Sequence, residues 1–439
     1  MATFYDVMFI AEPRSWRLLC IFNKHFAIQL RMSVVLFIST ILSLNNGLGD
    51  TPFLGWNSWN KFGCNIDENI VRRQADKIIE YGLDKLGYVY VNVDDCWMTT
   101  ERRNGYFVVD NERFPSGMKA LGDYIHSKGL KFGIYSSAGT YTCQKRAGSL
   151  GNEFKDAQSF ASYGVDLLKY DNCFNEGLNN RIDTINRYST MGNALSQQNR
   201  TILYSICQWG EEQPWEWASK IANTFRSTAD IGDRFDGEDP LCPCTTTNCT
   251  EFGYNCSVLN ILDKQVPITQ YSQPGFFNDM DMLEVGNGGM TFEEQKSHFF
   301  LWAALKSPLV IGADLRTISE QDLAILQLEE VIKVNQDPLG VSAKLLKRVA
   351  QKYDIWEGPL VDGSVLVLFN RSDDPLQIEL PVTMIKSLNC KGMKIVATDL
   401  LTLRTVEFVV AYESPRIKSH DSVMLKLECG KIERSRFNK

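Results

Sequence analysis

The chain has 439 residues, 44% of them hydrophobic and 23% charged, which is the composition of a globular protein large enough for a barrel and a smaller second domain. A formal net charge of −7 and the lack of any Lys/Arg run argue against a nucleic-acid partner. Only four histidines occur, and no Cys/His set has zinc-finger spacing, so acid–base chemistry falls to carboxylates and neither a metal nor a cofactor is predicted.

An apolar segment, Val34–Leu42, lies near the N-terminus directly after Arg31 and Met32. It is too short to span a bilayer but suits the hydrophobic region of a signal peptide. We therefore predict that residues 1–31 are an upstream extension, that translation starts at Met32, and that residues 32–45 are a signal peptide; a buried first helix is the alternative. Secretion agrees with twelve cysteines and with four glycosylation sequons, at Asn199, Asn248, Asn255 and Asn370.

Eight short and mostly apolar runs follow, separated by helical segments such as Asp67–Lys85 and Asn152–Tyr163. Continuous apolar runs are typical of strands buried on both faces, and strands that alternate with helices form a parallel sheet. Eight units within residues 46–340 predict a catalytic (β/α)8 TIM barrel, and no Gly-rich phosphate loop supports the alternative of an open doubly wound sheet. The predicted strands are Leu54–Asn60, Tyr88–Trp97, Lys131–Ser137, Val165–Cys173, Ile202–Gly210, Thr224–Ile231, Phe276–Val285 and Pro308–Leu315.

A cysteine-rich insertion separates the sixth and seventh predicted strands. Its cysteines are Cys242, Cys244, Cys249 and Cys256. In a secreted chain this pattern predicts a disulfide-bonded loop, and the lack of histidine disfavours a metal knuckle. Three pairings are possible; we favour Cys242–Cys256 with Cys244–Cys249, because Cys242 and Cys244 are too close to bridge easily.

The pattern changes after Gly340. Residues 341–439 contain short alternating strands and turn residues without a convincing helix, which predicts an antiparallel β-sandwich. The predicted strands are Tyr353–Glu357, Ser364–Asn370, Leu376–Leu380, Lys394–Asp399, Thr405–Val410 and Ser422–Leu427.

Two carboxylates, Asp171 and Asp230, close the fourth and sixth predicted barrel strands. Barrel enzymes hold catalytic groups at the carboxyl ends of their strands, and two carboxylates are the minimum for cleaving a glycosidic bond. With one strand between them, the two backbones would lie roughly 10 Å apart. Side chains leaning inward would bring the carboxylates closer, towards the range of about 5–5.5 Å found in retaining glycosidases.

Further polar and aromatic residues end neighbouring strands. Asp94 and Asp95 could form a solvated acidic turn, but their position at a strand end beside Trp97 favours sugar hydroxyls as partners. The polar segment Asn278–Met282 ends the seventh strand and lacks the oxygen spacing of a calcium loop. Aromatic residues predicted near the same face, where sugar rings could stack, are Trp56, Trp59, Tyr135 and Trp209.

Seven motifs, in register from Asn46 to the C-terminal domain, together resemble glycoside hydrolase family 27, the α-galactosidases or melibiases. They are Gly55–Trp59, Asp94–Trp97, Tyr135–Gly139, Lys169–Cys173, Cys207–Gly210, Arg226–Asp230 and Asn278–Met282. The cysteine-rich insertion is similar to that of the secreted yeast enzymes.

The resemblance implies a retaining double displacement, with Asp171 as nucleophile and Asp230 as general acid and then general base. It also implies disulfides Cys64–Cys96 and Cys143–Cys173, an unpaired Cys207, and a candidate pair formed by Cys390 and Cys429. Gln208 departs from the family, where Glu or Asn is common. The implied galactose-binding positions are Trp59, Asp94, Asp95, Tyr135, Cys143, Lys169, Gln208, Trp209, Arg226, Asp281 and Met282.

The implied activity is release of terminal α-D-galactose from melibiose, raffinose-type oligosaccharides or galactomannans by a secreted enzyme. An α-N-acetylgalactosaminidase needs small residues near the 2-substituent, and Gln208 and Trp209 are bulky. A β-L-arabinopyranosidase is a further alternative. A non-catalytic galactose-binding protein would have no need of both Asp171 and Asp230. The expected partner is a galactosyl oligosaccharide or polysaccharide, with no nucleic acid and no membrane after signal removal; a homo-oligomer stays open.

Overall fold

The computed structural model describes residues 44, 46–237, 256–390 and 393–430. The upstream extension and all but one residue of the predicted signal peptide, Leu44, therefore lie outside the described residues, as do Cys242, Cys244 and Cys249 of the insertion. Among the helices that are described, none is both long enough and apolar enough to cross a membrane.

Eight parallel strands form one sheet in the order β10-β1-β2-β5-β6-β7-β8-β9. A parallel bridge between Leu283 and Ile311 closes the sheet, with Leu283 N–H donating to the carbonyl of Val310 at 2.7 Å. The predicted (β/α)8 barrel is thus confirmed. Its strands are β1 (Leu54–Asn57), β2 (Tyr88–Asn92), β5 (Lys131–Ser137), β6 (Leu167–Asp171), β7 (Leu203–Cys207), β8 (Thr224–Arg226), β9 (Phe277–Asp279) and β10 (Leu309–Ile311).

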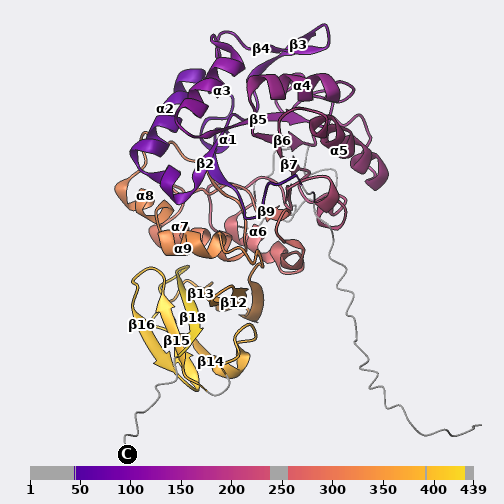
Figure 1. The fold of residues 1–439 in the computed structure, drawn as a ribbon. Helices are drawn as coiled ribbons and strands as arrows, with labels where there is room; N and C mark the ends of the chain where they lie inside the picture. The colour runs from indigo at the N-terminus through magenta and orange to yellow at the C-terminus, as the bar shows by residue number, and fades with distance from the viewer. Residues whose placement is uncertain (1–43, 45, 238–255, 391–392, 431–439) are drawn as a thin grey trace, which may run out of the picture. The chain divides into compact units, whose positions relative to one another are not determined.

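Helices surround these strands (Figure 1). Several begin at side-chain caps that satisfy free backbone N–H groups: Asp67 accepts from Ile70 N–H, and Ser257 and Thr291 form capping boxes. The helices are α1 (Trp59–Phe62), α2 (Glu68–Glu80), α3 (Gly117–Ser127), α4 (Glu153–Tyr163), α5 (Arg181–Ser196), α6 (Val258–Gln265), α7 (Phe292–Ala304), α8 (Glu320–Leu326) and α9 (Glu329–Asn335). Short 3-10 helices are Leu83–Leu86, Pro214–Glu216, Ala218–Lys220, Thr269–Tyr271 and Val382–Met384.

Most barrel strands are shorter than predicted. β8 ends at Arg226 rather than Ile231, because the buried residues that follow it form a loop rather than a ladder. A hairpin of β3 (Met98–Arg103) and β4 (Tyr106–Val109) was not predicted. Its turn, Asn104-Gly105, has positive φ at both residues (56° and 83°), so this Asn-Gly pair was a readable signal.

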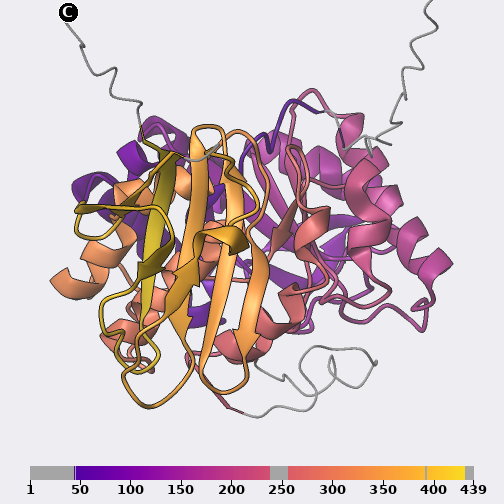
Figure 2. The same cartoon turned by 90° about the horizontal axis from the view of Figure 1, so that it is seen from below.

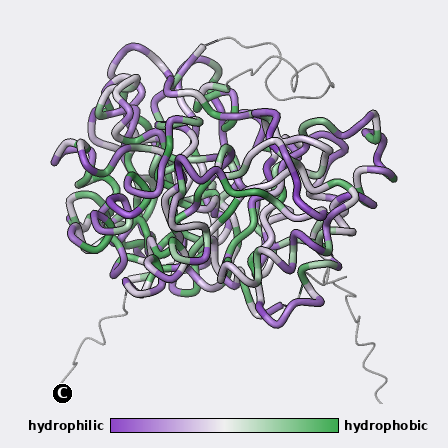
Figure 3. Tube along the Cα trace, turned by 90° about the horizontal axis from the view of Figure 1, so that it is seen from above, coloured by the Kyte–Doolittle hydropathy of each residue, from purple (hydrophilic) through white to green (hydrophobic). Residues whose placement is uncertain are grey.

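The hydrophobic core lies inside the barrel and between the strands and helices. Figure 3 shows hydrophobic stretches running through the interior, with hydrophilic stretches dominating the outer turns. The largest fully buried side chains include Trp56, Trp97, Trp302 and Tyr88. Such large interlocking groups fix the strand ends on which the site is built.

The C-terminal domain contains a six-stranded antiparallel sheet in the order β11-β12-β13-β18-β15-β16, whose broad strands are seen in Figure 2. A two-stranded sheet, β14 with β17, adds a second layer, which agrees with the predicted β-sandwich. A Cys390–Cys429 disulfide is present in this domain. The strands are β11 (Lys344–Val349), β12 (Tyr353–Leu360), β13 (Gly363–Asn370), β14 (Glu379–Pro381), β15 (Ile395–Asp399), β16 (Thr405–Phe408), β17 (Ala411–Glu413) and β18 (Ser422–Cys429).

Helix α7 contacts β13 and β18, and ionic contacts reinforce this interface between barrel and sandwich. Lys296 pairs with Asp421 at 2.7 Å. The ring of His420 stacks on Phe235 at a centroid distance of 5.2 Å, and its Nδ1 lies 2.7 Å from a carboxylate oxygen of Glu294.

The His420 contact predicts a pH-dependent stability. The hydrogen bond to Glu294, with the nearby charges of Asp373 and Asp236, raises the pKa of His420 above its ordinary value. The stabilisation is therefore fully present below the ordinary histidine pKa and is lost as pH rises through the raised value. We expect His420→Gln to lower the unfolding temperature at pH 5, at a cost of roughly 1 kcal/mol or less, and to lower it less at pH 8. Thermal unfolding of both proteins at the two pH values checks this; equal losses would contradict it.

Candidate active site

The carboxyl ends of the barrel strands bring several predicted site residues into one hydrogen-bonded network. The buried carboxylate of Asp94, after β2, accepts from Lys169 Nζ at 2.8 Å and from Asn57 Nδ2 at 2.8 Å. Lys169 Nζ also lies 5.4 Å from the ring centroid of Tyr135. Strands β1, β2, β5 and β6 thus each contribute to one polar cluster.

Asp171 ends β6 and is 5% exposed. Its Oδ2 accepts from the Tyr135 hydroxyl at 2.8 Å, and its Oδ1 accepts from Asn172 N–H at 2.9 Å. Burial raises the pKa of Asp171 to about 7, an effect that the positive charge of Lys169 opposes and the negative charge of Asp230 reinforces. The carboxylate is therefore fixed in place and desolvated, the condition in which an ionised oxygen is most reactive.

Asp230 lies in different surroundings. Its side chain is 42% exposed and accepts from Arg226 Nη2 at 3.0 Å. The buried guanidinium of Arg226 also pairs with Asp281 at 2.8 Å. One carboxylate is thus buried and the other open to solvent, a difference in environment that allows two carboxylates in one site to take different roles.

The described loops that follow the barrel strands include several non-glycine residues with left-handed backbone. Cys96, Trp209 and Asp281, which follow β2, β7 and β9, have φ values of 77°, 58° and 74°. Each such residue costs on the order of 1–3 kcal/mol, and such strain gathers at functional sites. At Asp281 the strained turn directs Oδ2 to the backbone N–H of Ile231 at 2.7 Å, which ties the loop after β9 to the loop after β8.

A disulfide, Cys143–Cys173, lies beside Asp171. The Tyr135 hydroxyl lies 3.3 Å from Cys143 Sγ. The backbone carbonyl of Cys173 would lie 1.9 Å from a Cβ at Gly139, so only glycine fits there. Sulfur in a disulfide is not a thiolate, so this cluster of two cysteines and an aspartate is not a metal site.

Not every predicted position points into the network. The Asp95 carboxylate accepts from the backbone N–H of Gln144 at 2.9 Å, and burial raises the pKa of Asp95 to about 6. The Gln208 amide is fully buried and has no hydrogen-bond partner among the described residues. The prediction that Trp56 lies near the sugar was wrong. Its side chain is fully buried in the core, where the indole N–H donates to the carbonyl of Ala313.

The remaining predicted positions lie along the rim. Trp59 opens α1 directly after β1, while Trp209 and Met282 follow β7 and β9 and are 6% and 5% exposed. A Cys64–Cys96 disulfide joins the chain after α1 to the turn after β2. Cys207, which ends β7, is free and buried.

Sequence reasoning did not single out Asn57 or Glu284. Asn57 lies inside the first family motif and holds Asp94, so its position was readable. Glu284 is buried beyond β9 and accepts from the side-chain amides of Asn60 and Asn287. Neither asparagine belongs to a charged motif, which is why this second polar cluster had no visible signal.

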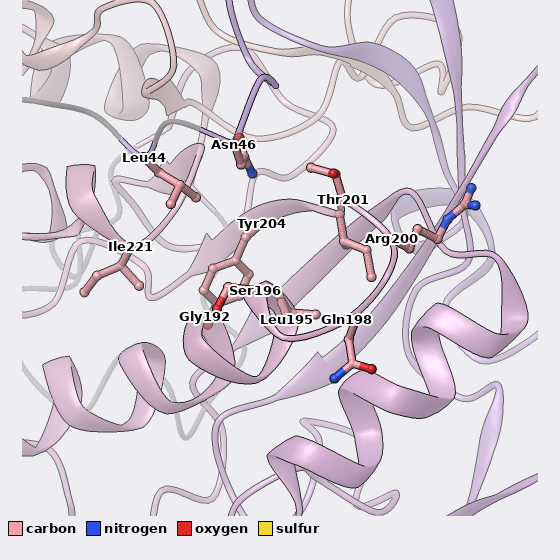
Figure 4. A pocket seen from close by; sticks show the side chains of 11 residues that line it. Leu44, Asn46, Gly192, Leu195, Ser196, Gln198, Arg200, Thr201, Tyr204 and Ile221 are labelled. Carbon is pink, nitrogen blue, oxygen red and sulfur yellow. The ribbon is translucent and has the colours of Figure 1, made fainter.

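The part of the chain that the structure describes contains cavities at both ends of the barrel. One of about 480 Å³ lies at the carboxyl ends, and its lining includes Asp230, Trp59 and Glu284. The other, of about 190 Å³, lies beside the start of β7 and the end of α5 (Figure 4). There the guanidinium of Arg200 points away from the cavity and pairs with Asp166.

One predicted glycosylation site is contradicted by the structure. Asn370 is fully buried, and its Nδ2 donates to the carbonyls of Asp374, Ile417 and Lys418, so it cannot carry a glycan in the folded chain. Asn199 is exposed. The sequons at Asn248 and Asn255 lie outside the described residues, and Cys256 of the insertion is disulfide-bonded.

Comparison with known proteins shows which family has this fold and these motifs. A family model described as Alpha galactosidase A matches residues 51–337, and the Alpha galactosidase C-terminal beta sandwich domain matches residues 350–427. Alpha-galactosidase 3 of Arabidopsis thaliana is 46% identical over 348 residues, covering 78% of this chain and 74% of that protein. The α-galactosidase of Zygotorulaspora mrakii is 45% identical over 336 residues, covering 74% of this chain and 72% of that protein.

Solved structures agree. Alpha-galactosidase I of Mortierella vinacea superposes with a TM-score of 0.83 at 42% identity, covering 87% of this chain and 98% of that one. The α-galactosidase of Saccharomyces cerevisiae with raffinose gives a TM-score of 0.82 at 32% identity, covering 88% and 99%. The chain therefore belongs to the α-galactosidase family of glycoside hydrolases.

Proposed function

We propose that the protein is a retaining α-galactosidase that removes terminal non-reducing α-D-galactose from melibiose, raffinose-type oligosaccharides or galactomannans. The observation that carries the proposal is a pair of carboxylates: Asp171 ends β6, and Asp230 lies in the loop that follows β8. Asp171 is buried and held by Tyr135, whereas Asp230 is exposed in the wall of the cavity at the barrel mouth. A fixed buried nucleophile beside an accessible acid is the equipment of a double displacement.

In the first step, a carboxylate oxygen of Asp171 forms a bond to the anomeric carbon while the bond from that carbon to the leaving oxygen breaks. Asp230 gives its proton to that oxygen, so the leaving group departs as a neutral alcohol. In the second step, Asp230 takes a proton from water, and the water oxygen displaces Asp171. Two inversions give net retention, and both carboxyl groups return to their starting states.

The cluster around Asp94 would hold the galactose. Asp94 and Lys169 are already paired, so their free lone pairs and protons are oriented for vicinal hydroxyls. Arg226 and Asp281 form the corresponding pair on the side of Asp230. The other proposed binding positions are Trp59, Asp95, Tyr135, Cys143, Gln208, Trp209 and Met282.

Lys169 should set the acidic limb of the pH profile. Its positive charge lowers the pKa of Asp171, so removing that charge raises this pKa. We expect Lys169→Gln to move the acidic limb of kcat/KM to higher pH and to reduce activity on that limb by roughly tenfold or more, since one pKa unit corresponds to about tenfold. Lys333→Gln, on the exposed face of α9, is the matched control. A pH profile of kcat/KM for an aryl galactoside that keeps its wild-type limb would contradict this role.

Trp209 and Gln208 should decide between galactose and N-acetylgalactosamine. We propose that the large Trp209 side chain lies against the 2-position of the sugar. The double substitution Trp209→Ala with Gln208→Ser should then lower activity on the aryl galactoside. It should raise the ratio of kcat/KM for the N-acetylgalactosaminide over the galactoside by about tenfold or more. An unchanged ratio in a folded double variant would place the 2-substituent elsewhere.

The remaining predictions are proposed with this function. Residues 46–340 would form the catalytic domain and residues 341–439 the sandwich, after an upstream extension and a signal peptide that directs secretion. Exposed Asn199 would be a glycan acceptor, together with Asn248 and Asn255, and the insertion would carry the pairs Cys242–Cys256 and Cys244–Cys249. N-terminal sequencing of secreted protein should begin near residues 44–50; a start at Ala2 would contradict the signal peptide.

Hydrolysis rates on a panel of p-nitrophenyl glycosides test the proposed specificity. We expect the α-galactoside to be hydrolysed fastest. Faster hydrolysis of the α-N-acetylgalactosaminide or the β-L-arabinopyranoside would reassign the specificity within the family. No hydrolysis of any of them would favour a galactose-binding protein.

A further inference from the structure

Helix α7 carries two fully buried side chains, His298 and Trp302, that the proposed reaction does not use. They stand about one helical turn apart on the same face, and their rings pack edge to face at a centroid distance of 4.1 Å. The helix also contacts β13 and β18, so it lies between the barrel and the sandwich (Figure 1). Both buried side chains contact the segment that follows β9.

These contacts hold the two ends of a short backbone segment. The indole N–H of Trp302 donates to the backbone carbonyl of Asp281 at 2.9 Å. His298 Nε2 accepts from the backbone N–H of Glu284 at 3.2 Å. Burial lowers the pKa of His298 to about 3, so the ring is neutral, and Nε2 accepts with the ring proton on Nδ1. Helix α7 therefore fixes the segment from Asp281 to Glu284 at its first and last residues.

The backbone of Asp281 needs such support. It is left-handed, with a φ of 74°. This conformation is unfavourable for a residue with a side chain, so it persists only where surrounding contacts enforce it. Trp302 makes its hydrogen bond to the carbonyl of this residue. Without that bond, we expect the Asp281 backbone to relax and its side chain to change direction.

The Asp281 carboxylate is bonded on both sides of the proposed general acid. Its Oδ2 pairs with Arg226 Nη2 at 2.8 Å and accepts from the backbone N–H of Ile231 at 2.7 Å. Arg226 Nη2 also donates to Asp230 at 3.0 Å, and Ile231 directly follows Asp230 in the chain. A shift of Asp281 would therefore move both the side-chain partner and the backbone of Asp230.

Acid catalysis is sensitive to such a shift. A misplacement of about 1 Å can cost about 10²-fold in rate, even when the altered residue lies far from the reacting atoms. We infer that Trp302 and His298 are positioning residues for the general acid Asp230, acting through the segment from Asp281 to Glu284. The inference rests on the proposed function, and it gives a part in the reaction to a helix that also holds the sandwich.

Two substrates with different leaving groups separate positioning of the acid from general damage. Melibiose needs protonation of its glycosidic oxygen, a dinitrophenyl galactoside needs little, and kcat/KM reports the first step for both. Trp302→Phe keeps a ring in the core but removes the N–H donor. It should reduce kcat/KM for melibiose about five- to tenfold more than kcat/KM for the dinitrophenyl galactoside. A loss of folded protein would lower both values equally.

Matched variants isolate the hydrogen bonds. Trp56→Phe is the control for Trp302→Phe, because Trp56 is also fully buried and its indole N–H donates to a backbone carbonyl, that of Ala313, at 2.8 Å. It should leave the ratio of kcat/KM for melibiose to kcat/KM for the dinitrophenyl galactoside unchanged. His298→Leu removes the acceptor for the Glu284 N–H and should lower this ratio, whereas His298→Gln keeps an acceptor oxygen and should retain a higher ratio than His298→Leu.

A double substitution tests whether Trp302 acts through Asp230. In Asp230→Asn the acid is already lost, so adding Trp302→Phe should lower the ratio by no more than about twofold further. A further loss of about fivefold or more in the double variant would show that Trp302 acts on another group.

The outcomes are distinct. An unchanged ratio in both Trp302→Phe and His298→Leu overturns the inference, and so does an equal fall of the ratio in Trp56→Phe. If Asp230→Asn itself leaves the ratio unchanged, or the wild-type protein hydrolyses neither substrate, the proposed function fails instead. If thermal unfolding shows that Trp302→Phe does not fold, the comparison of His298→Leu with His298→Gln decides, and equal ratios in these two variants overturn the inference.

Discussion

Asp171→Asn is expected to reduce hydrolysis of every α-galactoside by at least about 10⁴-fold, because an amide cannot form the glycosyl ester. The fold should survive. Burial raises the pKa of Asp171 to about 7, so at and above that pH the wild-type carboxylate is ionised at a cost to stability. A neutral amide of nearly equal shape removes this cost, and the variant should unfold at the same or a higher temperature at pH 7.

Three measurements together check this prediction. The steady-state rate of melibiose hydrolysis should fall by at least about 10⁴-fold. Calorimetry should still detect binding of galactose, and the unfolding temperature should not fall. Asp123→Asn, on the exposed face of α3, is the matched control and should behave as wild type. Near-normal turnover by Asp171→Asn, in protein free of contaminating enzyme, would show that another group attacks the anomeric carbon.

Asp230→Asn should produce the second largest effect, and its size should depend on the leaving group. The hexose released from melibiose would leave as a basic alkoxide unless the glycosidic oxygen is protonated, so hydrolysis of melibiose should fall by roughly 10²–10⁴-fold. A dinitrophenyl galactoside needs little acid assistance, so its first step should be largely preserved. Because Asp230 also activates water in the second step, the variant should show a burst of dinitrophenol followed by slow turnover.

Rapid-mixing kinetics separate these two steps. The burst rate reports formation of the glycosyl-enzyme, and the steady rate reports its hydrolysis. Asp230 would not be the acid if the first step slowed equally for melibiose and the dinitrophenyl galactoside. The partly exposed position of Asp230 in the cavity wall makes this a test of chemistry rather than of folding.

The barrel was predictable because its strands are buried on both faces and therefore read as apolar runs. The residues at which these strands end were not predictable. Ala229 and Ile231 are as buried as strand residues, so composition alone could not show that β8 stops at Arg226. The β3–β4 hairpin, whose exposed strand residues alternate weakly, was missed although its Asn-Gly turn is visible in the sequence.

At the site, Asp171 could be located because it ends an apolar run, and Asp230 because it lies near the end of a predicted strand. Both positions are local properties of the sequence. Properties that depend on distant segments could not be predicted. Asn370 looks like a glycan acceptor in sequence, yet the segment around Ile417 covers its amide. The cluster around Glu284 likewise forms only when segments after β1 and β9 meet.

The most direct test of the central claim is to trap the covalent intermediate and locate it. The enzyme would be treated with 5-fluoro-α-D-galactosyl fluoride, reduced, digested with trypsin and analysed by mass spectrometry. The tryptic peptide spanning residues 170–181 contains two carboxylates, Asp171 and Glu176, so fragmentation must assign the label to one of them. We predict a galactosyl ester on Asp171. A label on Glu176 or in any other peptide, or complete turnover with inversion of the anomeric centre, would contradict the account.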